Sequence, residues 1–174
     1  MTRPEQGYPA EAIANFFIEK AKEDKGVVMT HLKLQKLTYI AHGWCLGLHK
    51  HPLIDEAPQA WRYGPVIKSL YHALKHYGPD PIKKPIALPA VNSEDNIARV
   101  PAEDTEILEL LEAVWEAYKG AKPGQLVAAT HKDDTPWAKV YKPGVPNTPI
   151  DNGIIQRYYE KLAEENKNKK KAAA

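Results

Sequence analysis

The most informative part of the chain, within residues 34–78, is the stretch Ala60-Trp61-Arg62-Tyr63-Gly64-Pro65-Val66. Two aromatic residues and an arginine stand directly before a Gly-Pro step. Because proline has a fixed φ and no backbone N–H, Pro65 fits the first position of a helix and Gly64 the turn before it. The stretch therefore predicts a sharp corner that leads into a helix over 66–75. Its side chains are not chemically reactive, so the corner is typical of a packing or docking surface.

Length and composition narrow the class of protein. The chain has 174 residues, enough for one domain with a single core, and 43% of them are hydrophobic. Its formal net charge is only +2, whereas a nucleic-acid-binding domain usually has clustered Lys and Arg and a pI above about 9. The single cysteine excludes an intramolecular disulfide and a four-cysteine zinc site. No apolar stretch has signal-peptide or membrane-spanning length, so we expect a cytoplasmic protein.

Apolar residues recur at helical spacing along most of the chain. This pattern predicts a mainly α fold, a single compact domain of about six to seven helices over residues 9–164. We expect helices over 9–22, 31–48, 66–75, 103–118, 124–130, from 136 onward and over 151–164. Prolines from residue 79 to residue 101 disfavour a helix, and we expect a short β-hairpin in this Pro-rich connector, with strands over 82–88 and 96–100. Residues 165–174 form a basic, alanine-rich tail that we expect to be disordered.

The expected second helix contains two glycines, Gly43 and Gly47, which each weaken an isolated helix by about 1 kcal/mol relative to alanine. We therefore expect another segment to pack closely against them. Thr30, Thr135 and Asp151 are the predicted N-caps of three helices, because their side-chain oxygens can accept a hydrogen bond from the first turn.

Histidine and cysteine spacing indicates two kinds of chemistry to weigh. His72 and His76 are four residues apart on one predicted helix, a spacing that can chelate a metal, but no glutamate follows His72 as it would in a zinc protease. We favour the interpretation that both face solvent. Cys45 and His42 could form a nucleophilic pair, but reactive cysteines usually lie at helix N-termini or beside cations. Cys45 lies inside a predicted helix, so we favour a small buried side chain.

The polar run from His131 to Asp134 directly precedes Thr135-Pro136-Trp137. His131 with Asp133 or Asp134 could act as a general base, because a neighbouring carboxylate raises the pKa of a histidine. The alternative that we favour is the end of one helix and the cap of the next. A third interpretation is that His131 and Trp137 frame a partner-binding groove. No glycine-rich phosphate loop is present, and the sequence predicts no catalytic residue, cofactor or metal.

The remaining lysines and aromatic residues divide between surface and core. A weak basic face, explained equally well as solvated helix surface, would combine His72 with Lys33, Lys36, Lys68 and Lys75. Most of the Trp and Tyr side chains are expected in the core. Residues 61–63 are the best candidates for exposure, because they lie in a corner and not on an apolar helix stripe, and Trp, Tyr and Arg are enriched at interfaces.

Several motifs together resemble one known family. They are LQKLTYIA at residues 34–41, Pro52-Leu53, residues 60–66, Leu70-Tyr71, Tyr77-Gly78 and THKDDTPW at residues 130–137. The combination is similar to the Panacea antitoxin domain, the family of SocA-like antitoxins and phage-associated GepA-type proteins. The resemblance covers residues 10–163 and is specific because the AWxYGPV pattern and the later TH…PW pattern occur together.

The resemblance implies a mostly helical bacterial antitoxin that neutralises a cognate protein toxin encoded nearby. The leading hypothesis is direct protein–protein binding, because the sequence lacks a credible active site and offers an aromatic corner. One family representative instead delivers its toxin to the ClpXP protease, which makes this protease a further partner to test. Membranes and nucleic acid are not expected as partners. An alternative from another class is a hydrolase-like enzyme centred on His131. The expected partner-binding or structural residues are Trp61, Arg62, Tyr63, Gly64, Pro65, Lys68, His72, His131 and Trp137.

Overall fold

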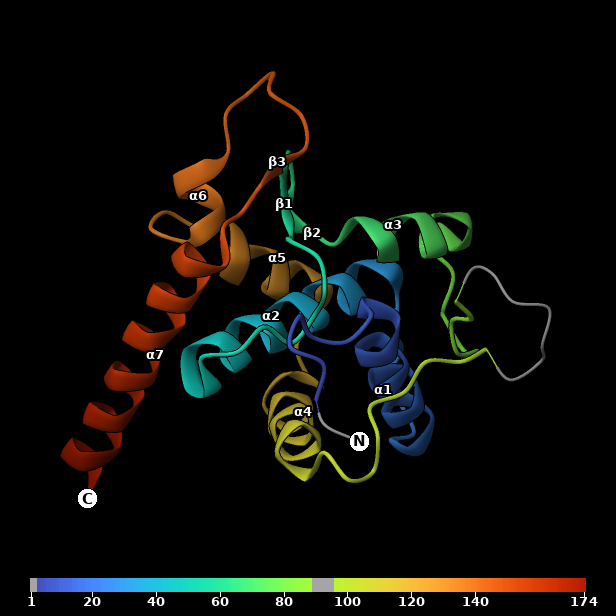
Figure 1. Cartoon of the computed structure of the whole chain (residues 1–174), viewed down its shortest axis with the longest axis horizontal. Helices are drawn as coiled ribbons and strands as arrows, with labels where there is room; N and C mark the ends of the chain where they lie inside the picture. Colours follow the sequence, from blue (N-terminus) through green and yellow to red (C-terminus); the bar gives the residue numbers. More distant parts are fainter. Residues whose placement is uncertain (1–2, 89–95) are drawn as a thin grey trace.

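A long helix, α2 (His31–His49), runs through the middle of the protein (Figure 1). The computed structural model describes residues 3–88 and 96–174. Within these residues the other α-helices are α1 (Ala10–Glu23), α3 (Lys68–Leu74), α4 (Thr105–Tyr118), α5 (Pro123–His131), α6 (Pro136–Val140) and α7 (Asn152–Ala173). The 3₁₀ helix η1 (Lys75–Tyr77) extends α3, and the strands are β1 (Gln59–Trp61), β2 (Gly64–Val66) and β3 (Thr148–Pro149). The prediction of a mainly α domain is confirmed.

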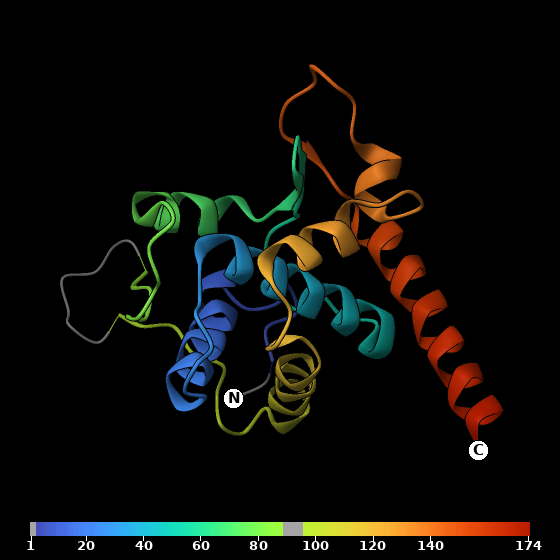
Figure 2. The same cartoon turned by 180° about the vertical axis from the view of Figure 1, so that it is seen from behind.

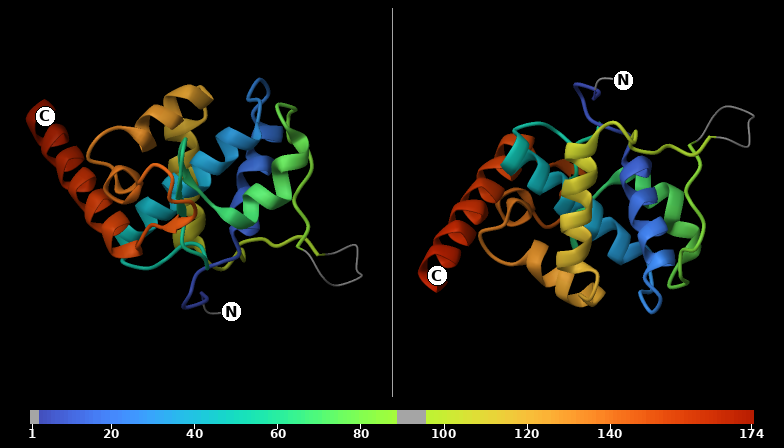
Figure 3. Two further views of the ribbon diagram at one scale, coloured as in Figure 1. Left: turned by 90° about the horizontal axis from the view of Figure 1, so that it is seen from above. Right: turned by 90° about the horizontal axis from the view of Figure 1, so that it is seen from below.

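Helix α2 is the core element on which the others pack. It contacts α1, α3, α4, α5 and α7. Figure 3 shows α1 and α4 together beneath it, and Figure 2 shows α5 against it from behind. Because neighbours surround it, α2 buries residues on nearly every side, including Leu34, Leu37 and Cys45. A helix that buries residues on nearly every side is typical of the centre of a domain, so α2 serves as the axis of the fold.

The α2–α7 contact confirms the prediction for the two glycines. A Cβ atom at Gly47 would lie 2.7 Å from the Cβ of Tyr159, closer than real Cβ atoms approach. A Cβ at Gly43 would overlap the ring of the same tyrosine. The glycines therefore let α7 lie directly on α2, and the ring of Trp44 meets Tyr159 edge-on at 5.2 Å between centroids.

The corner is a β-hairpin, which corrects the prediction that a helix begins at Pro65. β1 and β2 pair antiparallel with Trp61 opposite Gly64, and β3 joins the other side of β1, in the order β2-β1-β3. Pro65 has no backbone N–H to donate, and it is tolerated because β2 is an edge strand that pairs with β1 on one side only. Helix α3 starts later, at Lys68, after Ile67 as its N-cap.

The Pro-rich connector contains no strand among residues 82–88 and 96–100, which corrects the predicted hairpin there. Residues 89–95 of that prediction lie outside the described residues. Instead of a strand ladder, the buried side chain of Asn15 holds both arms. Its Nδ2 donates to the carbonyls of Ile86 and Ala98 at 3.0 Å each, and its Oδ1 accepts from the Ile86 N–H at 2.7 Å. The backbone bonds that strands would share are thus partly taken by one side chain on α1.

The last helix continues to Ala173, whereas the sequence analysis expected residues 165–174 to be disordered. Lys and Ala are strong helix formers, and Lys170 and Lys171 in the last turn suit the negative end of the helix dipole. This end of α7 is exposed and projects from the body of the protein (Figure 1). In the part of the chain that the structure describes, no helix is both long and apolar enough to cross a membrane.

Candidate functional site

The hairpin corner is fastened to the core by two side chains of α2. Gln35 forms a pair of hydrogen bonds with Ile67, because its Nε2 donates to the Ile67 carbonyl and its Oε1 accepts from the Ile67 N–H, both at 2.9 Å. Lys36 donates from Nζ to the carbonyl of Pro65 at 2.9 Å. Both side chains are buried. The Gln-Lys pair of the LQKLTYIA motif therefore holds the second strand at its middle residue, Pro65, and just past its end, at Ile67.

The burial of Lys36 corrects the predicted basic face. Lys36 is only 1% exposed and Lys33 only 5%, and Lys33 Nζ donates to the carbonyls of Lys119 and Ala121 just past α4. Removal from water disfavours the charged ammonium and lowers the pKa of Lys36 to about 8. Gly64, at φ +111°, makes room for this side chain, since a Cβ there would lie 2.8 Å from Lys36 Nζ. Helical periodicity gave no signal for this contact.

Helices α5 and α6 support the other side of the corner. Trp137 Nε1 donates to the carbonyl of Trp61 at 2.7 Å, and His131 Nε2 lies 3.2 Å from the carbonyl of Arg62. The rings of His131 and Trp137 stack with centroids 3.7 Å apart, and Tyr141 stacks on Trp137 at 4.7 Å. The TH…PW motif therefore contacts the AWxYGPV motif through backbone carbonyls of the hairpin turn.

Local structure explains how Trp137 reaches this position. Thr135 is the N-cap of α6, and its Oγ1 accepts from the Ala138 N–H at 3.3 Å, as predicted. Pro136 occupies the first helical turn, where its missing N–H costs nothing. Because α6 is a short helix fixed at its start, the indole is directed at β1.

The tip of the hairpin presents Arg62 and Tyr63 to solvent. Tyr63 is 69% exposed, and the Arg62 guanidinium lies 5.3 Å from the centroid of its ring. Trp61 is half-buried, with its Nε1 donating to Gln59 Oε1 and its ring 4.7 Å from that of Tyr71. The predicted exposure is thus confirmed for Arg62 and Tyr63, and only partly for Trp61.

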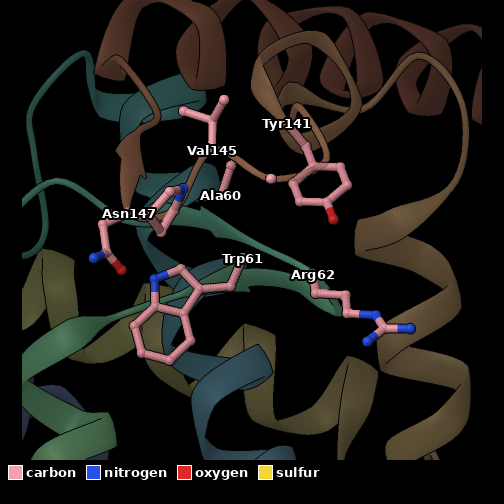
Figure 4. Close-up of a pocket in the computed structure, with 8 residues that line it drawn as sticks. Ala60, Trp61, Arg62, Tyr141, Val145 and Asn147 are labelled. Atoms are coloured by element: carbon pink, nitrogen blue, oxygen red, sulfur yellow. The ribbon is translucent and has the colours of Figure 1, made fainter.

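A hollow lies on each side of the tip. The first, of about 440 Å³, is lined by Ala60, Trp61, Arg62, Tyr141, Gly144, Val145, Pro146 and Asn147. Figure 4 shows Tyr141 and Val145 on one side of it and Trp61 and Arg62 on the other. The second, also of about 440 Å³, lies toward α2 and α3. Trp61 and Arg62 line both hollows, so they form the wall between them.

Two of the predicted site residues lie apart from this cluster. Lys68 and His72 are exposed on α3, and His72 lines a separate hollow with His76, beside the Pro-rich connector. The structure thus brings together residues 61–65, His131 and Trp137. Gln35, Lys36 and Tyr141 belong to the same cluster, but the sequence analysis did not select them as site residues.

The structure places the candidate catalytic groups in other roles. No hydrogen bond joins His131 to Asp133 or Asp134 among the described residues, and Asp134 lies 3.7 Å from the Lys161 ammonium. Burial raises the pKa of the Cys45 thiol to about 12, which suits the predicted buried side chain. Within residues 3–88 and 96–174, no group of three or more His, Cys, Asp or Glu side chains is placed to hold a metal ion.

His42 is a buried structural residue. Its Nδ1 accepts from the backbone N–H groups of Leu53 and Ile54 at 3.3 and 3.4 Å, and its Nε2 lies 2.9 Å from Asn152 Oδ1. Burial lowers its pKa to about 4, so the ring is neutral near pH 7. The imidazole therefore connects α2, the loop after it and the start of α7.

Comparison with known proteins identifies the class to which this helical domain belongs. Residues 34–138 match the family described as "Antitoxin SocA-like, Panacea domain". The chain belongs to this family of antitoxins, and the resemblance drawn from the motifs is confirmed. The match includes the LQKLTYIA, AWxYGPV and TH…PW motifs that meet at the corner.

A curated relative is similar over most of the chain. It is "Antitoxin SocA" of Caulobacter vibrioides (strain NA1000 / CB15N), which is 32% identical over 137 residues. The alignment covers 79% of this chain and 72% of the relative. No solved structure matches the protein.

Proposed function

We propose that this protein is the antitoxin of a toxin–antitoxin pair and neutralises a cognate protein toxin, encoded by a neighbouring gene, by binding it directly in the bacterial cytoplasm. The observation that carries the proposal is the exposed hairpin tip, Arg62 and Tyr63, on a rigid base. Arg and Tyr are enriched among the residues that dominate binding energy at protein interfaces. Membership of the antitoxin family supplies the kind of partner.

The base of the tip supports a binding role because it is already ordered. Gln35, Lys36 and Trp137 hold the hairpin backbone through hydrogen bonds of 2.7–2.9 Å. A loop that is fixed before binding loses little conformational entropy when a partner covers it. In this proposal no chemical step is catalysed, and His131 acts by stacking on Trp137 and by contacting the turn.

The experiment is co-expression of the protein with the product of the adjacent open reading frame, scored first by growth and then by co-purification. Rescue of growth together with a stable complex is the expected result. Rescue accompanied by ClpXP-dependent loss of the neighbouring protein would replace direct neutralisation with delivery to that protease. A neighbour that is harmless when expressed alone would overturn the proposal. The enzyme alternative would then be examined with His131→Ala.

A further inference from the structure

The hollow between the start of α2, the hairpin and α3 has a polar floor and an apolar wall. Its apolar wall is formed by Leu32, Trp61, Val66 and Tyr71. We propose that this hollow accepts an acidic side chain of the partner protein, followed or preceded by an apolar residue, and that Lys36 and Arg62 bind its carboxylate. The inference rests on the proposed function, because the occupant is a segment of the bound toxin.

Among the described residues, no carboxylate balances the buried charge of Lys36. An ammonium group has three N–H donors, and a buried charge is normally paired with an opposite one. Among the described residues, Lys36 Nζ makes one hydrogen bond, to the Pro65 carbonyl, and no carboxylate oxygen lies within 4.0 Å of it. Burial alone lowers its pKa, with no acidic neighbour to oppose this. A carboxylate in the hollow would supply the missing counter-charge and acceptors.

The described residues that line the hollow include cations but no acidic side chain. Besides Lys36, the hollow is lined by the exposed cation Arg62 and by His31, and none of the lining residues, all within the described part of the chain, is acidic. Like charges repel an arriving cation, whereas two cations attract a carboxylate from a distance. Charge complementarity therefore favours an acidic occupant.

The mouth of the hollow has an exposed apolar surface. Leu32 is 43% exposed and Tyr63 is 69% exposed, and both line it. Covering them requires an apolar group next to the acidic one. Apolar contact around a charge pair also excludes water, and this strengthens the pair. The partner segment is thus expected to carry an acidic and an apolar side chain side by side.

The test uses two peptides that differ in one functional group, acetyl-Phe-Glu-amide and acetyl-Phe-Gln-amide, titrated into the full chain and followed by NMR. We expect the acidic peptide to shift the indole N–H signal of Trp61 and the backbone signals of Leu32 and Val66. We expect the affinity of the neutral peptide to be lower by about tenfold or more, which is the order of effect for a close charge pair. Equal binding of the two peptides, or no shift at these residues, would overturn the proposal.

Variants of Arg62 and Lys36 then test whether each of these cations binds the carboxylate. Arg62→Gln and Lys36→Gln are each expected to remove most of the preference for the acidic peptide, because each replaces a cation by a neutral amide. Lys25→Gln is the matched control, an exposed cation outside the hollow, and should keep the preference. If Lys36→Gln does not fold, Arg62→Gln alone decides, because Arg62 is exposed at the hairpin turn.

The peptide titration and the co-expression experiment can fail independently of each other. Peptide discrimination needs no toxin, and co-purification with the neighbouring gene product needs no peptide. A stable toxin complex without peptide discrimination would refute the acidic occupant and leave the antitoxin role standing. Discrimination without toxin rescue would show that the hollow binds an acidic group, but it would overturn the antitoxin role and, with it, the toxin as the source of that group.

Discussion

Replacing Gln35 with methionine is expected to destabilise the protein by about 2 kcal/mol, although the two side chains have nearly the same volume. The substitution leaves no cavity but removes both hydrogen bonds to Ile67, each 2.9 Å long. The buried Ile67 N–H would lose its acceptor, whereas the Ile67 carbonyl would still accept from the Tyr71 N–H at 3.0 Å. An unpaired buried polar group costs roughly 1–3 kcal/mol, so the orphaned N–H accounts for the stated loss. A domain of this size has a total stability of about 5–15 kcal/mol.

Urea unfolding followed by circular dichroism measures this loss, and hydrogen exchange locates it. The Ile67 amide should exchange much faster in Gln35→Met, because its acceptor is gone. Gln6→Met is the control, since Gln6 is exposed, and should change stability by less than about 0.5 kcal/mol. If Gln35→Met were as stable as the wild type and kept the Ile67 amide protected, then α2 would not hold the corner.

Three further predictions concern the frame of the site. Gly47→Ala should cost about 1–3 kcal/mol by forcing α7 off α2, whereas the open position Gly124→Ala should not destabilise, as urea unfolding will show. Between pH 7 and pH 5 the folded state should lose about 2 kcal/mol from His42 alone, because the pKa of His42 is about 6.5 in the unfolded chain and about 4 in the folded protein, so the unfolded chain binds more protons. His42→Gln should remove this part of the pH dependence and leave the contribution of His31, whose pKa is also lowered by burial. Trp137→Phe keeps the stacking but loses the bond to the Trp61 carbonyl, which should lower stability by about 1–2 kcal/mol in thermal unfolding.

Local signals in the sequence were sufficient for most helices and for the packing of α7. Apolar spacing and the caps Thr30, Thr135 and Asp151 placed the helix starts, and the cap hydrogen bonds are present. Gly43 and Gly47 indicated a close neighbour, because a glycine in a helix is otherwise unfavourable. These features depend on residues near one another in sequence.

The parts that the sequence analysis missed depend on contacts between distant segments. Pro65 fits a helix start as well as an edge strand, and the choice depends on β1 and on Lys36. Lys36 looked solvent-exposed because helical periodicity places a lysine outside by default, whereas the carbonyl that it binds lies 29 residues further along the chain. Leu32 and Ile40, four residues before and after Lys36 on the helix, are both apolar, and this is the signal that would have indicated its burial.

The proposal that the hairpin tip binds the toxin is tested most directly by measuring affinity. Calorimetry would measure the affinity of the partner found by co-expression for the wild type and for the tip variant Arg62→Ala/Tyr63→Ala. The control is the double variant Lys25→Ala/Val28→Ser, which changes two exposed residues away from the tip. We expect the tip variant to bind at least about 100-fold more weakly and the control to match the wild type. A tip variant that folds normally and binds the partner as tightly as the wild type would contradict the account.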